Sequence, residues 1–300
     1  FYALRNTIRE NGGTVMQKIW VCGARGQIGQ AVNDVVDKLE FEMLDTDVDD
    51  LDVTDTDEVL RFGEMNRPDI IINCSGMTDI SSCEENPSQA FKVNALGARN
   101  LAIVAAKMQA KMVQLSTDDV FDGKSTEPYT EFDITNPGTV YGKSKLAGEN
   151  YVKEFTTKHF IVRSTWVYGK GQNFINGFLK KVDAGEQLSI ASDQFGSPTS
   201  ANELARFLLH LVHTSEYGTY HATNKGVCSR YAFAQEILKM TGKTASMQPV
   251  PTVMSDFSKV RPAYAVLDNF IMSMVPIYDF PDWQDSLREY LEERGLYHAE

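Results

Sequence analysis

The first half of the chain alternates short apolar runs with longer segments in which apolar residues recur every three or four positions. A short apolar run is typical of a buried strand, and the wider spacing is typical of a helix with one buried face. The predicted strands are Lys18–Cys22, Phe41–Leu44, Ile70–Cys74, Lys111–Ser116 and Phe160–Arg163. The predicted helices are Ile28–Leu39, Thr54–Asn66, Pro87–Gln109 and Lys143–Phe155. Strands that alternate with helices indicate parallel β-α-β units and an α/β fold with a doubly wound parallel sheet.

The second half of the chain is less regular. The helices expected there are Asn173–Ala184, Ala201–His213, Tyr231–Thr241 and Trp283–Arg294. Prolines interrupt much of the chain from residue 249 to residue 281. The change of pattern predicts a large first domain and a smaller second one, with the chain crossing back once. At the start, charged residues interrupt any signal-like apolar stretch, so we expect residues 1–15 to be an upstream or non-native tail.

Composition narrows the class of protein. Hydrophobic residues make up 42% and charged residues 23% of the chain, which is ordinary globular usage and argues against a disordered protein. The formal charge of -12 disfavours nucleic acid and anionic membrane surfaces as partners. No apolar run approaches the roughly 20 residues that span a bilayer, so we expect no membrane association.

Cysteine and histidine spacing points away from disulfides and metal. The four cysteines contain no C-x-x-C pair, and the five histidines show no metal-ligand pattern. We therefore expect free thiols in a cytoplasmic protein and no metal site formed by side chains. A role for Mg²⁺ stays open at this point.

A glycine-rich turn follows the first predicted strand and opens the first predicted helix. It reads Gly23-Ala24-Arg25-Gly26-Gln27-Ile28-Gly29, with G-x-x-G-x-x-G spacing. Glycines allow a tight turn and a close backbone approach to a pyrophosphate, and a helix N-terminus offers N–H groups to an anion. The turn predicts dinucleotide binding by Gly23, Arg25, Gly26, Gln27, Ile28 and Gly29.

An acidic residue after the second strand is expected to hold the adenosine ribose hydroxyls. Asp45 and Asp47 both qualify, and we prefer Asp47 for its distance from Gly29. No Lys or Arg lies close after this strand to accept a 2′-phosphate, so the sequence favours NADH over NADPH. Arg25, inside the glycine turn, is the residue that would reverse this preference.

A tyrosine and a lysine form the strongest chemical signal. Tyr141 and Lys145 are four positions apart at the start of a predicted helix, so they share one face. Ser116 and Thr117 end the fourth strand, and ligands of doubly wound sheets bind at the carboxyl ends of strands. A free tyrosine has a pKa of about 10, and a nearby ammonium lowers it. These are the parts of a hydride-transfer site in which the protein delivers the proton.

At this point the chain resembles the extended short-chain dehydrogenase/reductases and, within them, the dTDP-4-dehydrorhamnose reductases, from about Lys18 to Arg294. The resemblance rests on five stretches: Leu115-Ser116-Thr117-Asp118-Asp119-Val120-Phe121, Tyr141-Gly142-Lys143-Ser144-Lys145-Leu146-Ala147-Gly148-Glu149, Arg163-Ser164-Thr165-Trp166-Val167-Tyr168, Asp193-Gln194-Phe195-Gly196-Ser197-Pro198-Thr199 and Arg261-Pro262. It implies a Rossmann-type doubly wound sheet with a smaller C-terminal α/β substrate domain. The expected NAD(P)-binding domain spans 16–168, with a return segment near 196–228, and residues 169–300 mainly bind substrate.

The resemblance also implies roles. Thr117, Tyr141 and Lys145 resemble a catalytic triad. Tyr141 would be the general acid, Lys145 would tune its pKa and bind the ribose, and Thr117 would donate to the carbonyl. Further cofactor contacts implied are Asp52, Val53, Cys74, Ser75 and Gly76, and implied substrate contacts are Thr117, Asp118, Val120, Trp166, Gln194, Ser197 and Arg261. The implied reaction is NAD(P)H-dependent reduction of the 4-keto group of a nucleotide-linked 6-deoxyhexose, in deoxysugar or polysaccharide biosynthesis.

Two departures from the family lie near the substrate side. Ser81 and Ser82 stand where the family usually has Asp and Lys, and Asp119 stands where it has Tyr. Two alternatives stay open: a non-catalytic nucleotide-binding regulatory subunit, and an epimerase or dehydratase of the same superfamily. The Asp118-Asp119 pair superficially fits a dehydratase. The sequence also leaves open the sugar, the base and whether the protein is a homodimer.

Overall fold

A computed structural model describes residues 16–254 and 263–298. Six parallel strands form one sheet in the order β10-β5-β4-β3-β1-β2. Their bounds are β1 Gln17–Cys22, β2 Phe41–Thr46, β3 Ile70–Asn73, β4 Lys111–Thr117, β5 His159–Ser164 and β10 Gly218–His221. The chain runs from β1 to β2 on one side and then to β3 on the other. The carboxyl ends of β1 and β3 therefore form the switch point at which such sheets bind ligands.

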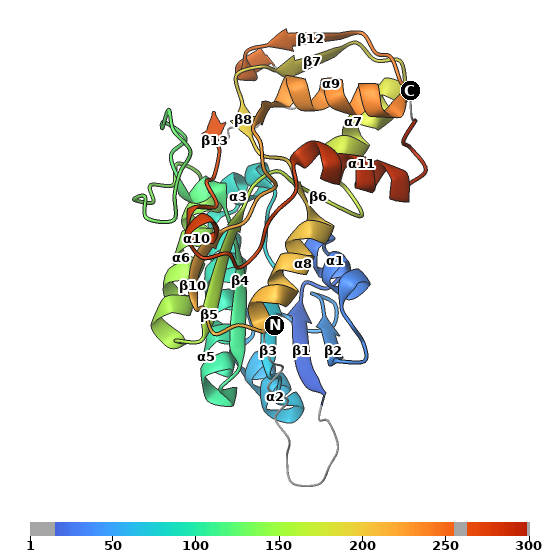
Figure 1. Cartoon of the computed structure of the whole chain (residues 1–300). Coiled ribbons are helices and arrows are strands. Elements are labelled where there is room, and N and C mark those ends of the chain that lie inside the picture. Colours follow the sequence, from blue (N-terminus) through green and yellow to red (C-terminus); the bar gives the residue numbers. More distant parts are fainter. Residues whose placement is uncertain (1–15, 255–262, 299–300) are drawn as a thin grey trace.

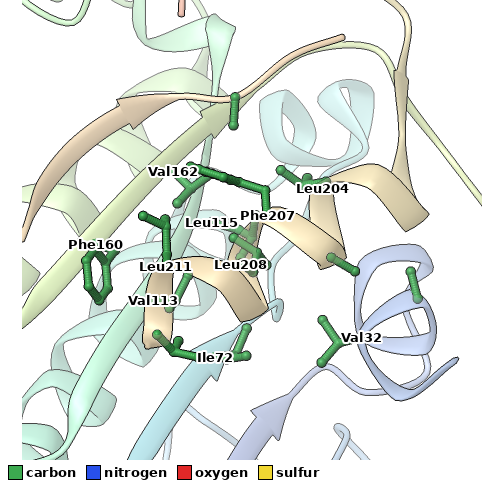
Figure 2. Packing of buried hydrophobic residues seen from close by; sticks show 14 of the residues in the cluster. Val32, Ile72, Val113, Leu115, Phe160, Val162, Leu204, Phe207, Leu208 and Leu211 are labelled. Atoms are coloured by element: carbon green, nitrogen blue, oxygen red, sulfur yellow. The ribbon is translucent and has the colours of Figure 1, made fainter. Parts of the chain in front are cut away.

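Helices cover both faces of this sheet (Figure 1). Their bounds are α1 Gln27–Val35, α2 Thr56–Asn66, α3 Ile80–Glu85, α4 Pro87–Phe91, α5 Ala98–Met108, α6 Val140–Phe155 and α8 Ala201–Val212. On one face, α1 and α8 pack against Ile72, Val113 and Val162 (Figure 2). On the other face, α2, α5 and α6 pack around Ile71 and Met112. Because neighbouring strand residues face opposite sides, the all-buried β3 serves both cores.

A second, smaller group of elements lies beyond the carboxyl edge of the sheet, at the top of Figure 1. It contains three small sheets, ordered β11-β8-β13, β12-β7 and β6-β9. Its strands are β6 Val167–Tyr168, β7 Leu188–Ala191, β8 Phe195–Gly196, β9 Thr199–Ser200, β11 Cys228–Ser229, β12 Met247–Val250 and β13 Tyr264–Ala265. Its main helices are α7 Phe174–Asp183, α9 Arg230–Thr241 and α11 Trp283–Glu293, and α10 Phe270–Met274 lies beside β10. A separate core of aromatic and aliphatic side chains joins α7, α9 and α11.

The predicted fold class, an α/β fold with a doubly wound parallel sheet, is confirmed. After β9, α8 packs over the large sheet and β10 pairs with β5 at its edge. The four cysteines are free. Within the described ranges, no helix is long and apolar enough to cross a bilayer.

Several predicted boundaries were wrong. The first helix ends at Val35, because Val36 is extended and Leu39, 89% exposed, lies in a turn closed by Asp37. The second strand continues to Thr46, whose hydroxyl accepts a hydrogen bond from the Trp20 indole at 2.8 Å.

The helix predicted over Pro87–Gln109 is divided by a π-helical segment, Lys92–Gly97, between α4 and α5. Short 3₁₀ turns, Asp118–Val120 and Thr252–Met254, were also not predicted. Nor was α3, which begins where the Asp79 carboxylate caps the Ser82 N–H.

Candidate active site

The glycine turn joins β1 to α1 at the switch point of the sheet. Gly23 has φ +77°, and a Cβ there would lie 2.7 Å from the Ser75 nitrogen. A Cβ on Gly29 would lie 2.3 Å from the Gly23 carbonyl oxygen. Gly26 caps α1 without a side chain, so the first turn of the helix offers its N–H groups to an anion. The close approach of β1, β3 and α1 therefore requires glycine at positions 23 and 29.

Asp47 follows β2 directly and lies beside this turn. Its carboxylate accepts a hydrogen bond from the Arg25 backbone N–H at 2.8 Å. The Arg25 guanidinium forms ion pairs with Asp49 at 2.6 Å and Asp50 at 2.8 Å. Asp45, the alternative acid, lies inside β2. The arrangement places Asp47 at the glycine turn, with the Arg25 charge directed to two other carboxylates.

The end of β3 lies next to the predicted lysine. The Ser75 hydroxyl donates to the Asn73 side-chain oxygen at 2.5 Å. A Cβ on Gly76 would lie 3.1 Å from the Asn94 side-chain oxygen and 3.7 Å from the Lys145 amine nitrogen. The segment Cys74–Gly76 and Lys145 therefore meet, although Gly76 and Lys145 are 69 positions apart in the chain.

Of the segment expected beside adenine, Asp52 accepts a hydrogen bond from the Thr54 N–H at 2.8 Å. Val53 is buried in the core under α2 and α5, where Gly97 leaves room for it. Its carbonyl accepts a hydrogen bond from the Asn100 side chain at 3.0 Å. The Val53 side chain is thus part of this core, and its contact with adenine stays a prediction.

Tyr141 and Lys145 lie in the first two turns of α6, and both are buried. The helix begins where the Thr139 hydroxyl accepts a hydrogen bond from the Gly142 N–H at 2.9 Å. A Cβ on Gly142 would lie 2.0 Å from the Asp119 carbonyl oxygen, so α6 begins in contact with the end of β4. Burial lowers the pKa of the Lys145 amine to about 8, against the raising effect of Glu149.

Thr117 ends β4, and the 3₁₀ turn Asp118–Val120 follows it. The Thr117 hydroxyl donates to the Asp118 carboxylate at 2.9 Å and accepts from the Asp119 N–H at 3.2 Å. Thr117, Asp118 and Asp119 are all buried. Val120 is also buried and packs in a small core cluster with Phe121, so its side chain is a packing group.

The other predicted substrate residues gather in the smaller group of elements. Trp166 has φ +47°, and a Cβ on Gly196 would touch its ring at 2.6 Å. The Arg230 guanidinium lies 3.4 Å from the ring centroid. Gln194 is buried, and its carbonyl accepts a hydrogen bond from the Arg230 N–H at 3.0 Å. Trp166 is therefore a packed side chain, with Gly196 and Arg230 against its ring.

Ser197 points into a different environment. Its hydroxyl donates to the Gly226 carbonyl at 2.8 Å. It also lines a cavity of about 350 Å³ whose other walls include Thr223–Val227 and Val266–Asn269. This cavity lies beyond the carboxyl end of β10, and Thr117, Tyr141 and Lys145 do not line it. Arg261 lies outside the described residues.

Two residues of this site were missed by sequence reasoning. Asn94, in the π-helical segment, binds the backbone N–H and carbonyl of Met77 and donates to the Ser144 hydroxyl at 2.9 Å. An asparagine within an apolar helical run was the available signal, and π-helical turns are frequent at functional sites. Arg230 is the other. Its contacts with Trp166, 64 positions away, and with Phe174 distinguish it from a surface arginine.

The parallel sheet, its glycine turn at the switch point and the polar groups at the ends of β3 and β4 define a Rossmann-type dinucleotide-binding protein. The chain belongs to the RmlD substrate binding domain family, which matches residues 16–295. The resemblance inferred from the motifs is thereby confirmed.

Three relatives cover nearly the whole chain. It is 35% identical over 281 residues to the spore coat polysaccharide biosynthesis protein SpsK of Bacillus subtilis, covering 93% of this chain and 99% of that one. A dTDP-4-dehydrorhamnose reductase structure from Clostridium acetobutylicum is 40% identical, with a TM-score of 0.91, covering 93% of this chain and 100% of that one. A Bacillus anthracis dTDP-4-dehydrorhamnose reductase, solved with NADP, is 35% identical, with a TM-score of 0.90 and the same coverage.

Proposed function

We propose that this protein reduces the 4-keto group of a dTDP-linked 6-deoxyhexose with a nicotinamide cofactor. The observation that carries the proposal is the meeting of three segments. Lys145 lies beside Gly76 at the end of β3, and α6 begins against the segment that follows Thr117. The relatives named as dTDP-4-dehydrorhamnose reductases support the substrate class, and the NADP complex of one of them supports the cofactor.

The residues at the switch point fit a dinucleotide. Gly23 and Gly29 leave no space for a Cβ, as a close backbone approach requires, and the N-terminus of α1 suits a pyrophosphate. Asp47 and Asp52 would hold the adenosine end, and the segment Cys74–Gly76 would line the nicotinamide side. When bound, the cofactor supplies the hydride.

The protein then has to supply a proton to the carbonyl oxygen. We assign this step to the Tyr141 hydroxyl. Lys145, one helical turn away, would stabilise the phenolate that remains and bind the ribose. Thr117 would hold the carbonyl oxygen after its hydroxyl turns away from Asp118. Burial of all three side chains excludes water, which strengthens these charge effects.

The diphosphate of the substrate needs a local cation, since the whole chain carries a formal charge of -12. We propose Arg230 for this role, together with Arg261. Arg230 is partly buried, is held over Trp166 and Phe174, and is bonded through its N–H to the predicted substrate loop at Gln194. A stacked guanidinium keeps its planar donors in a fixed orientation, which suits phosphate oxygens.

The finer assignments follow the sequence. We propose that NADH serves at least as well as NADPH, because Asp47, beside the glycine turn, would take the ribose hydroxyls and Arg25 is paired with Asp49 and Asp50. We also propose that residues 16–168, with the return segment near 196–228, form the cofactor domain and that the remainder mainly binds substrate. A cytoplasmic location, a homodimer and any use of Mg²⁺ stay predictions.

The test is an assay of the purified protein with dTDP-4-keto-6-deoxyhexose, following NADH or NADPH oxidation and identifying the product sugar. The proposal expects cofactor oxidation coupled to formation of a dTDP-6-deoxyhexose. Loss of water or inversion at a carbon without net oxidation of NADH or NADPH would instead identify a dehydratase, which Asp118-Asp119 superficially fits, or an epimerase. No turnover with either cofactor, by a folded protein that binds both ligands, would contradict the proposal.

A further inference from the structure

One carboxylate is completely buried inside the large domain. The Glu149 side chain, in α6, has no solvent exposure, and the Arg163 side chain is 4% exposed. Arg163 donates two parallel hydrogen bonds to it, from Nε at 2.9 Å and from Nη2 at 2.8 Å. The Ser116 hydroxyl donates a third at 2.6 Å. A buried charge persists only when it is paired and hydrogen-bonded, and all of these conditions are met here.

The partners of Glu149 come from the segments that carry the proposed active site. Ser116 immediately precedes Thr117 at the end of β4. Arg163 lies on β5, three residues before Trp166. Glu149 itself follows Lys145 by one helical turn and Tyr141 by two. One side chain therefore sets the position of α6 relative to β4 and β5.

Among the described residues, Glu149 is also the charged side chain that most raises the pKa of Lys145. Burial lowers the pKa of Lys145, while Glu149 and Cys74 raise it. Cys74 carries no charge near neutral pH, because burial raises the pKa of its thiol to about 12. Burial is the largest influence and raises the pKa of Glu149, but the hydrogen bonds and charge of Arg163, the Ser116 hydroxyl and the charge of Lys153 together hold that pKa below its usual range. Glu149 is therefore ionised throughout the working pH range.

The remaining groups around Glu149 are accounted for. Lys153, on the next turn of α6, lies 3.7 Å from its carboxylate and is 42% exposed. His221, at the end of β10, is buried and neutral, because burial and then Arg163 lower its pKa to about 3. Asn94, from the π-helical segment, is neutral and donates a hydrogen bond to Ser144, which lies on α6 as Glu149 does. The anion between Lys145 and Arg163 is thus Glu149.

We propose that Glu149 is a positioning residue for the reduction proposed above, fixing α6 against β4 and β5 and keeping Lys145 in its charged form. The inference rests on the proposed function for its effect on catalysis. It does not depend on that function for its effect on Lys145 itself.

The sign of the effect follows from the charges. An ammonium loses stabilisation when a neighbouring carboxylate becomes neutral, so Glu149→Gln lowers the pKa of Lys145 below about 8. The alkaline limb of the kcat/KM profile then moves to lower pH. A shift of one pH unit corresponds to about a tenfold loss of activity on that limb.

Two control variants separate charge from hydrogen bonding. Lys153→Gln removes a charge on the exposed side of Glu149 and should leave the alkaline limb within about 0.2 pH unit of wild type, well below the roughly one-unit response of a direct charge partner. Ser116→Ala removes one hydrogen bond but keeps the charge. It should lower kcat without moving the limb.

Glu149→Gln leaves Arg163 buried without its counter-ion, which can prevent folding. The double variant Glu149→Gln with Arg163→Met removes both charges and keeps the volume. If the single variant does not fold, the double variant carries the test, and a shift of the limb in the same direction is expected.

A second measurement reads Lys145 directly. The rate at which acetic anhydride labels Lys145 is measured against pH by mass spectrometry, with no substrate present. The midpoint should fall in Glu149→Gln or in the double variant. If wild-type protein reduces no dTDP sugar, the proposed function fails while this measurement still decides the inference. The inference would be overturned if the variants had a lower thermal stability but kept both the labelling midpoint of Lys145 and the alkaline limb of the kcat/KM profile.

Discussion

Gly29 offers the sharpest test of the cofactor site. An alanine Cβ at this position would lie 2.3 Å from the Gly23 carbonyl oxygen and 2.7 Å from the Ala24 Cα. Ordinary contacts begin at 3.4 Å, so α1 or the glycine turn must move by about 1 Å. Both neighbours are backbone atoms and cannot rotate away. Overpacking of this kind costs about 1–3 kcal/mol, which corresponds to about a 5- to 150-fold weaker cofactor complex if the strain falls on the bound geometry.

The assay is a fluorescence titration of Gly29→Ala with NADH and NADPH, accompanied by thermal unfolding to confirm that the variant is folded. Gly177→Ala is the matched control. Gly177 lies inside α7, and an added Cβ there meets no described atom within 4 Å. The control should bind both cofactors normally and gain about 0.5–1 kcal/mol of stability from its helical position. A Gly29→Ala protein with cofactor Kd values within twofold of wild type would refute the assignment of this turn.

The remaining predictions concern the proton donor, the substrate cation and the cofactor. Tyr141→Phe should lose about 100- to 10,000-fold in kcat with cofactor Kd unchanged, and a near wild-type rate in stopped-flow reduction would contradict the mechanism. Arg230→Gln should raise the KM for the dTDP sugar about tenfold or more, since charge-assisted hydrogen bonds contribute roughly 1.5–3 kcal/mol, whereas Arg230→Lys should retain part of the affinity. An unchanged KM with a lower Tm would show that Arg230 only packs on Trp166. Arg261→Ala should likewise raise the KM for the dTDP sugar, and an unchanged KM with a lower Tm would show a structural role. Steady-state kinetics should give NADH a kcat/KM at least equal to that of NADPH, and a strong NADPH preference would point to Arg25.

Local pattern was sufficient for most elements of the large sheet. The strand β3 was readable because Ile70–Ile72 forms an uninterrupted apolar run between a turn and a glycine segment. The helix α6 was readable because Tyr141 and Lys145 recur on one face of a periodic segment. The π-helical interruption at Lys92–Gly97 could not be predicted from the local sequence pattern. It depends on Asn94 binding Met77 and Ser144, which lie 17 and 50 positions away.

The substrate side shows the same division. Trp166 was identified from a motif, but its environment comes from Gly196 and from Arg230. Those contacts cross 30 and 64 positions of sequence and are made in a second core that the pattern did not outline. Arg230 was therefore overlooked, and Val120, which the family motif includes, proved to be a core side chain.

The sequence by itself determined what depends on near neighbours along the chain. It specified the alternation of strands and helices, the glycine turn whose atoms lie within seven residues, and the tyrosine and lysine one helical turn apart. The tertiary structure decided which strand ends meet, and so which side chains share a site. The order β10-β5-β4-β3-β1-β2 brings Ser116, Glu149 and Arg163 together and places Lys145 beside Gly76. Apolar periodicity encodes which face of each element is buried. It does not encode which partner that face packs against, because many pairings bury the same area.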